Sequence, residues 1–218
     1  MKKILMILML IVNAIIFGQN TLPNDAIQRY KLENSKADLK VFVGEKINVQ
    51  RSIDTNQNGF YLDQKYILKY KVITNVYGKI KKDTIVFTAF DHYGIPPFTK
   101  FKNVLLYVKK VNDQYFHCKY QYNPVFKTKK DKWAGPYSTY DYGRKIKNDS
   151  KIKPEIIDFE GDPSIDLSGY PKDKAKRWFF EPYYKIEKDK AMIIYGNYVK
   201  DLFELKKNGI LKRRGYFK

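Results

Sequence analysis

Cysteine is almost absent from this chain of 218 residues, and Cys118 is the only one. One thiol cannot form an internal disulfide, so the stability of the fold must come from packing. Histidine is nearly as scarce, with His92 and His117 alone. Zinc sites use closely spaced cysteine and histidine ligands, and these three residues do not supply such a set. We therefore expect no metal and no other cofactor.

Arginine is also scarce, because only six of the 42 basic residues are arginine. With 23 acidic residues the formal net charge is +19, which favours anionic partners. Arginine, however, is the residue suited to bidentate contacts with phosphates and bases. We therefore attribute most of the charge to composition and solubility and expect no specific nucleic acid partner. An acidic glycan or another protein remains as the expected partner.

Long apolar runs are missing except at the start of the chain. Lys2 and Lys3 precede an apolar run of 14 residues, 4–17, which ends before the small residue Gly18. About 20 residues are needed to span a bilayer, so the pattern predicts a signal peptide over residues 1–19. The alternative is an uncleaved N-terminal anchor. We expect a secreted or periplasmic protein with no transmembrane segment after cleavage.

What the sequence has in abundance is β-strand patterning. Tyr66, Leu68, Tyr70 and Val72 fall on one face of a strand, and lysines alternate with them, so the period is two. Residues 83–90 repeat the pattern with β-branched and aromatic side chains. Residues 104–108 and 115–122 form an expected hairpin that turns at 111–114.

An earlier strand is predicted over residues 39–50. Gly44 in its middle indicates a bulge or bend, as found where a strand curls around a barrel. The apolar residues that we expect to share one face are Leu39, Val41, Val43, Ile47 and Val49.

The predicted fold class is mainly β: a curved antiparallel sheet or OB-like barrel with an irregular α+β C-terminal extension. Residues 20–123 form the barrel-like domain, with a short N-terminal helix over 21–36, and residues 124–218 form an extension packed on the barrel. Within the extension, residues 174–180 are expected to make one or two helical turns before Pro182.

The last patterned segment, residues 202–211, is ambiguous. Asn208-Gly209 between apolar flanks is a strong hairpin signal. The spacing of Leu202, Phe203 and Lys206 suits a helix instead, with Gly209 just beyond its end. We favour the hairpin.

The order of four segments, 39–49, 68–78, 83–87 and 104–108, with the turn Val76-Tyr77-Gly78, resembles the netrin-like and metalloprotease-inhibitor-like modules. These are OB-type β-barrels of secreted proteins, so the resemblance implies a barrel. Their inhibitory wedge depends on an N-terminal cysteine and on disulfides that this sequence lacks. Inhibition of a metalloprotease is therefore not implied, and fold alone does not assign a function.

Few residues could support catalysis. A cysteine and a histidine can form a thiolate nucleophile, but His117 and Cys118 point to opposite faces of one strand and cannot pair. A hydrolase would have to use Asp91 and His92 with carboxylates from residues 158–166. We expect Cys118 to be a buried thiol.

Residues 158–166 place acidic side chains at alternating positions, which is similar to a calcium loop. Pro163 stands where an EF-hand needs glycine, and Gly169 stands where it needs glutamate. We therefore favour a solvated acidic turn.

Two groups of aromatic residues lie in the C-terminal half. The first group is expected in loops, where rings can stack on sugars or bases, and its candidate binding residues are Trp133, Tyr137, Tyr140, Tyr142 and Arg144. The second group is more apolar than exposed surfaces tolerate, so we favour its packing over the barrel core. This group consists of Trp178, Phe179, Phe180, Tyr183 and Tyr184.

The function expected from these patterns is an exported non-enzymatic binding protein of the bacterial envelope or extracellular space. The partner is a protein or an acidic glycan. The alternative is an exported hydrolase that uses His92 with nearby carboxylates.

Overall fold

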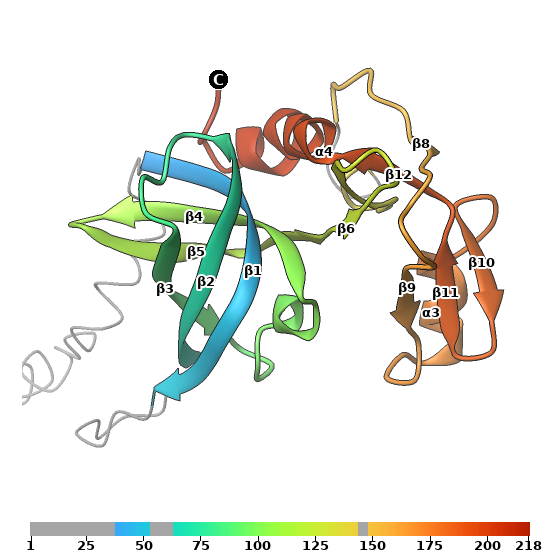
Figure 1. Ribbon diagram of the computed structural model, residues 1–218, viewed down its shortest axis with the longest axis horizontal. Helices are drawn as coiled ribbons and strands as arrows, with labels where there is room; N and C mark the ends of the chain where they lie inside the picture. The colour runs from blue at the N-terminus through green and yellow to red at the C-terminus, as the bar shows by residue number, and fades with distance from the viewer. Residues whose placement is uncertain (1–37, 53–62, 144–147) are drawn as a thin grey trace, which may run out of the picture. The chain divides into compact units, whose positions relative to one another are not determined.

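The computed structural model describes residues 38–52, 63–143 and 148–218. Its five longest strands form a closed barrel with the order β1-β2-β3-β5-β4 (Figure 1). The predicted mainly β fold is confirmed, and of the two expected forms, a curved antiparallel sheet or an OB-like barrel, the strands form a closed barrel. The expected signal peptide and the expected helix over 21–36 lie outside the described residues. The barrel strands are β1 (Asp38–Ser52), β2 (Gln64–Tyr77), β3 (Thr84–Asp91), β4 (Asn103–Val111) and β5 (Gln114–Pro124).

The barrel closes because β1 pairs with β2 along one edge and with β4 along the other. All of these pairings are antiparallel except that of β3 with β5, where Thr88 lies beside Phe116 in parallel. The β4–β5 hairpin turns at Asn112 and Asp113, whose φ angles are 46° and 61°. Two central residues at positive φ match the twist of the flanking strands, which confirms the hairpin predicted at 111–114.

The barrel interior is apolar and aromatic. Tyr66, Leu68 and Tyr70 of β2 are buried in it, and Val72 packs against it, as the alternation in the sequence predicts. A single turn of 3-10 helix, η1 (Pro97–Lys100), places Phe98 in the same interior. The inner face of the sheet is therefore defined by the period-two pattern.

Strand β1 departs from the prediction because its apolar residues do not share one face. Its pairing with β2 shifts register next to Gly44 and again between Lys46 and Asn48. A one-residue slip moves following side chains to the other face. The bulge predicted at Gly44 is thus confirmed, but the single face is wrong. Leu39, Val41 and Val43 pack outside the barrel interior, Val49 packs against it, and Ile47 is half exposed.

Two small sheets follow the barrel. The helix α3 (Lys172–Trp178) confirms the helical turns predicted over 174–180, although it begins two residues earlier and ends before Phe179. The four-stranded sheet has the order β6-β7-β12-β8 and the three-stranded sheet has the order β10-β11-β9. Their strands are β6 (Phe126–Lys127), β7 (Trp133–Pro136), β8 (Glu155–Ile156), β9 (Ser164–Asp166), β10 (Tyr184–Glu187), β11 (Lys190–Ile193) and β12 (Tyr195–Tyr198).

The second aromatic group does not close the barrel core, contrary to expectation. Tyr184 is buried in a separate hydrophobic cluster with Ile165 and Ile193, and Phe179 and Tyr183 pack against that cluster. Short strands from distant parts of the chain build this cluster, so the barrel is not needed to cover these rings.

The hairpin favoured for residues 202–211 is wrong, because the segment is helical. It consists of α4 (Val199–Lys206) and a helical turn, η2 (Lys207–Leu211), with a kink at Gly209. Leu202, Phe203 and Leu211 bury their side chains against Leu39 and other residues outside the barrel interior. Burial of one apolar helix face therefore prevails over the local turn signal of Asn208-Gly209. Among the described residues, no helix has both the length and the apolar character to cross a membrane.

Candidate functional site

Trp133 lies in a strand, although the sequence suggests a loop. It belongs to β7, pairs with Lys127 of β6 and packs against the apolar cluster beneath α4. The ammonium of Lys127 lies 5.1 Å from the centroid of its ring. Trp133 is thus half buried and does not join the other candidate tyrosines.

Tyr137 and Tyr142 join the second aromatic group instead of standing free. The rings of Tyr137 and Tyr183 stack with centroids 3.7 Å apart and planes within 10°, and Tyr142 stacks on Tyr137 at 5.1 Å. The hydroxyl of Tyr142 donates to the side-chain carbonyl of Asn197, and burial raises the pKa of Tyr142. These rings hold residues 137–142 against the small sheets and leave little surface for a ligand.

Tyr140 is the candidate residue with the most exposed ring. Its side chain is 47% exposed, and its ring meets Trp178 edge to face at 6.2 Å. Trp178 in turn meets Tyr170 at 5.9 Å. We call Tyr140, Tyr170 and Trp178 the aromatic surface. Tyr170 is absent from the sequence-based candidates, although its position between the breakers Gly169 and Pro171 is a signal for a loop residue. It is half buried and packs against the cluster that contains Tyr184.

Helix α3 supplies positive charge next to the aromatic surface. Lys172, Lys174, Lys176 and Arg177 are exposed, and within the described residues none of them forms an ion pair. Trp178 directly follows Arg177 and ends the helix. Arg144, the remaining candidate binding residue, lies outside the described residues.

A buried ion pair anchors the loop that carries Tyr140. The ammonium of Lys206 in α4 lies 2.7 Å from Oδ1 of Asp141, and both side chains are less than a tenth exposed. The amide of Asn123 in β5 donates to Oδ2 of Asp141 at 2.8 Å. Asn148 also donates to the backbone carbonyl of Asp141. Since Asp141 adjoins Tyr140, the pair ties the aromatic surface to both the barrel and α4.

His92 lies close to a carboxylate other than those expected. Its Nδ1 is 3.7 Å from Oδ1 of Asp63, and Lys119 contacts the same carboxylate at 2.7 Å. The side chain of Asp91 is buried and accepts the backbone N–H of Tyr93. The histidine ring is 42% exposed, so this group lies at the surface.

His117 and Cys118 point to opposite faces of β5, as predicted. The ring of His117 lies inside the barrel, 4.5 Å from that of Phe98. Cys118 is 2% exposed in the cluster beneath α4, where burial raises the pKa of its thiol. Its sulfur lies 3.5 Å from the hydroxyl of Tyr216. The prediction of a buried thiol is confirmed.

The acidic residues of 158–166 do not converge. Asp158 pairs with Lys129 at 2.9 Å, and Asp166 accepts the backbone N–H of Ser168. Within the described parts of the chain, no group of three or more histidine, cysteine, aspartate or glutamate residues is arranged to hold a metal ion.

No protein-family model, curated protein or solved structure matches this chain.

Proposed function

We propose that this chain is a non-enzymatic binding protein, exported to the bacterial envelope or extracellular space, whose partner is a protein or an acidic glycan. The observation that carries the proposal is the exposed ring of Tyr140 against Trp178, beside the cations of α3, which form no ion pair with any residue that the structure describes. Export rests on the charged start and apolar run of residues 2–17.

The arrangement supports binding for two physical reasons. Tyrosine and tryptophan present a large apolar face with a polar tip, so they contribute strongly to recognition of both sugars and proteins. The ion pair between Asp141 and Lys206 holds the loop of Tyr140 before a partner arrives. A pre-organised surface loses less conformational entropy on binding.

Substitution of Tyr140 by alanine tests the proposal. Wild type and Tyr140→Ala would be used to recover partners from an envelope extract and from immobilised acidic and neutral glycans. The salt concentration should be about 0.5 M, at which distant charges are screened. We expect the recovered partner to bind Tyr140→Ala at least tenfold more weakly, because a contact tyrosine can contribute more than about 1.4 kcal/mol.

Tyr93→Ala is the matched control, because Tyr93 is 86% exposed in a different loop. It should recover the same partner as wild type. Equal recovery by Tyr140→Ala and wild type, or no specific recovery by wild type, would contradict the proposal.

A second candidate function is an exported hydrolase that uses His92 with a carboxylate. The observation in its favour is the distance of 3.7 Å between His92 and Asp63. Hydrolysis of an ester, amide or glycoside substrate by wild type but not by His92→Ala would favour it. Identical rates for the two proteins would remove it.

A further inference from the structure

Six lysines lie on the hairpin formed by β2 and β3, and all are exposed. The hairpin also carries two carboxylates, of which Asp91 is buried and accepts the backbone N–H of Tyr93. Asp83 is thus its single exposed carboxylate. We call this surface the lysine hairpin, and its cations are Lys65, Lys69, Lys71, Lys79, Lys81 and Lys82.

The charges of the lysine hairpin are not neutralised within the described residues, where none of the six lysines forms an ion pair. Other exposed lysines do: Lys129 lies 2.9 Å from Asp158, and Lys185 lies 2.7 Å from Glu187. Clustered like charges repel one another and create a positive potential that attracts an anionic partner. The hairpin therefore differs from the parts of the lysine-rich surface where each lysine has a carboxylate partner.

The turn that carries half of these lysines is held firmly. The side chain of Asn75 accepts the N–H of Ile80 at 3.0 Å and donates to its carbonyl at 3.2 Å. Ile80 is 5% exposed and belongs to the barrel interior. The lysines on either side of it, Lys79 and Lys81, consequently project from a fixed backbone.

Gly78 brings the same turn onto β1. Its φ is +62°, and a Cβ there would lie 2.9 Å from the carbonyl oxygen of Leu39 and 2.7 Å from the side chain of Lys40. Only glycine fits this conformation and this close approach. The turn is therefore pre-organised, which lowers the entropic cost of binding.

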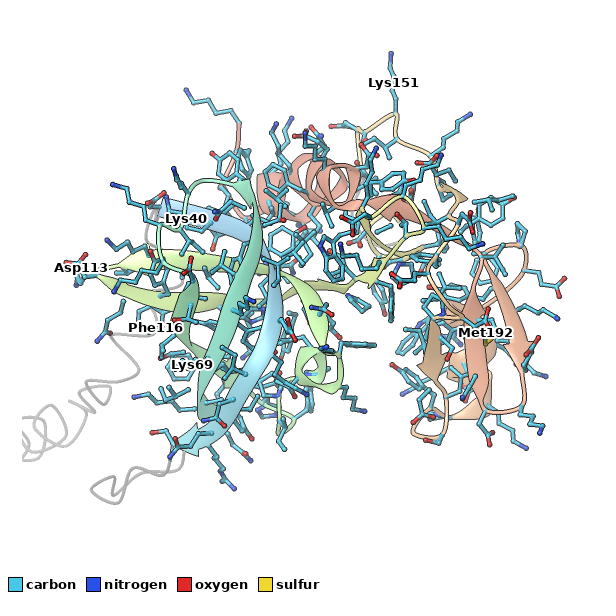
Figure 2. The ribbon with its side chains drawn as sticks, in the orientation of Figure 1. Lys40, Lys69, Asp113, Phe116, Lys151 and Met192 are labelled. Carbon is cyan, nitrogen blue, oxygen red and sulfur yellow. The ribbon has the colours of Figure 1, made fainter. Side chains whose placement is uncertain are left out.

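Lys69 and Lys71 extend the charge along the outer face of β2; Figure 2 labels Lys69 on this strand. Residues two apart on a strand share a face and lie about 6.6 Å apart. Their cross-strand neighbours on β3 are Val86 and Thr84. On β1, Glu45 lies opposite Lys71, but its carboxylate pairs with Lys102 at 3.3 Å. The row is thus positive and extended.

We infer that the lysine hairpin is a docking surface for a linear acidic polysaccharide. A nucleic acid is less well matched, because the hairpin has no arginine and its neighbours Thr84 and Val86 cannot stack on bases. A membrane surface is also less well matched, because membrane-binding faces insert large apolar side chains and Val86 is small. The inference rests on the proposed binding function but uses residues distinct from the aromatic surface.

The test is the affinity of the full chain for polygalacturonate at low salt. The variant is the triple substitution Lys69→Gln, Lys71→Gln and Lys81→Gln. We expect the triple variant to bind at least tenfold more weakly. The slope of log affinity against log salt should fall in magnitude by up to about 3, because a surface with three fewer cations releases fewer counterions when it binds the polyanion.

The control is a triple substitution that removes the same charge from paired lysines: Lys110→Gln, Lys129→Gln and Lys185→Gln. It should bind within threefold of wild type. Neither triple variant alters Tyr140, Tyr170 or Trp178, so this inference and the aromatic surface can fail separately.

Three outcomes would overturn the inference. The first is equal weakening by both triple variants, which would indicate a net-charge effect. The second is the absence of binding by wild type. The third is tighter binding to a 20-nucleotide oligo(dT) or to anionic phospholipid vesicles than to polygalacturonate, which would assign the surface to a different anion.

Discussion

The barrel interior and the contact beneath α4 both enclose an ionisable side chain. They differ in whether that side chain is neutral or is charged and paired with a carboxylate. Inside the barrel, His117 lies against Phe98 and Phe87. Burial lowers the pKa of His117 to about 4, although its Nε2–H donates to the carbonyl of Gln121 at 2.9 Å. Beneath α4, Lys206 has a carboxylate partner at 2.7 Å. The histidine is therefore neutral at pH 7, whereas the lysine is paired.

The difference follows from which segments meet in each region. The barrel interior is lined by alternating residues of neighbouring strands, and these are apolar or aromatic. The partner of Lys206 comes from a loop 65 residues earlier in the chain. A buried charge is tolerated only where another segment delivers its counter-charge and the remaining hydrogen bonds. The barrel interior thus depends on apolar packing, whereas the region beneath α4 combines apolar packing with a buried polar pair.

The largest expected effect is the loss of a ring from the barrel interior. Phe87 is 1% exposed and contacts Tyr70 and Phe98. Phe87→Ala should lower the free energy of unfolding by about 3–5 kcal/mol, since it removes apolar burial and leaves a cavity. Urea unfolding measures the change. The control Val86→Ala changes the opposite, exposed face of β3 and should lower the free energy of unfolding by less than about 0.5 kcal/mol. Equal losses of unfolding free energy in the two variants would contradict the assignment of the two faces.

The next effect tests the polar pairing beneath α4. Lys206→Met should cost about 3 kcal/mol of unfolding free energy, because it leaves the carboxylate of Asp141 buried without its cation. Lys207→Met is the control, since the pair of Lys207 with Glu204 is more than a third exposed and should contribute less than about 1 kcal/mol.

A second variant separates pairing from packing in the same contact. Lys206→Met combined with Asp141→Leu removes both charges and should recover much of the loss. If Lys206→Met cost no more than Lys207→Met in urea unfolding, polar pairing would not distinguish this region from the barrel.

The smallest effect is the pH dependence that His117 confers on the barrel. The ordinary pKa of 6.5 applies in the unfolded chain, and the folded value is about 4. The unfolded state therefore takes up the proton first, and stability should fall as the pH drops from about 6.5 towards about 4. The difference between the two pKa values corresponds to a loss of at most about 3 kcal/mol in the free energy of unfolding. The measured loss should be smaller, because the side chain keeps some contact with solvent.

Urea unfolding at pH 7 and pH 5 measures this loss. His117→Gln keeps a donor for the Gln121 carbonyl but cannot be protonated, so its stability should change less over the same range. An unchanged pH dependence in His117→Gln would show that other groups cause it.

Several features of the fold could be predicted from local sequence patterns. The alternation in β2 predicts the inner face of the barrel, and the turn at 111–114 predicts the β4–β5 hairpin. The opposite orientations of His117 and Cys118 follow from the same period of two. These features depend on residues that are neighbours along the chain or across one turn.

The candidate site could be predicted only in part. Tyr140 is exposed, as an aromatic residue in a loop should be. Its contact with Trp178 and the stack of Tyr137 on Tyr183 join segments about 40 residues apart, and no local pattern pairs them. The residues that flank Trp133 in the sequence have the composition of a loop, yet the pairing of Trp133 with Lys127 makes it part of a strand.

By itself the sequence determined a mainly β fold, as a curved sheet or a barrel, with one buried thiol, because side-chain alternation, turn residues and a single cysteine act locally. Only the tertiary structure decided the helix at 199–211 in place of a hairpin, the two faces of β1, and the joining of the aromatic groups. Each of these depends on burial against distant residues, and such burial outweighs local preferences of about 1 kcal/mol.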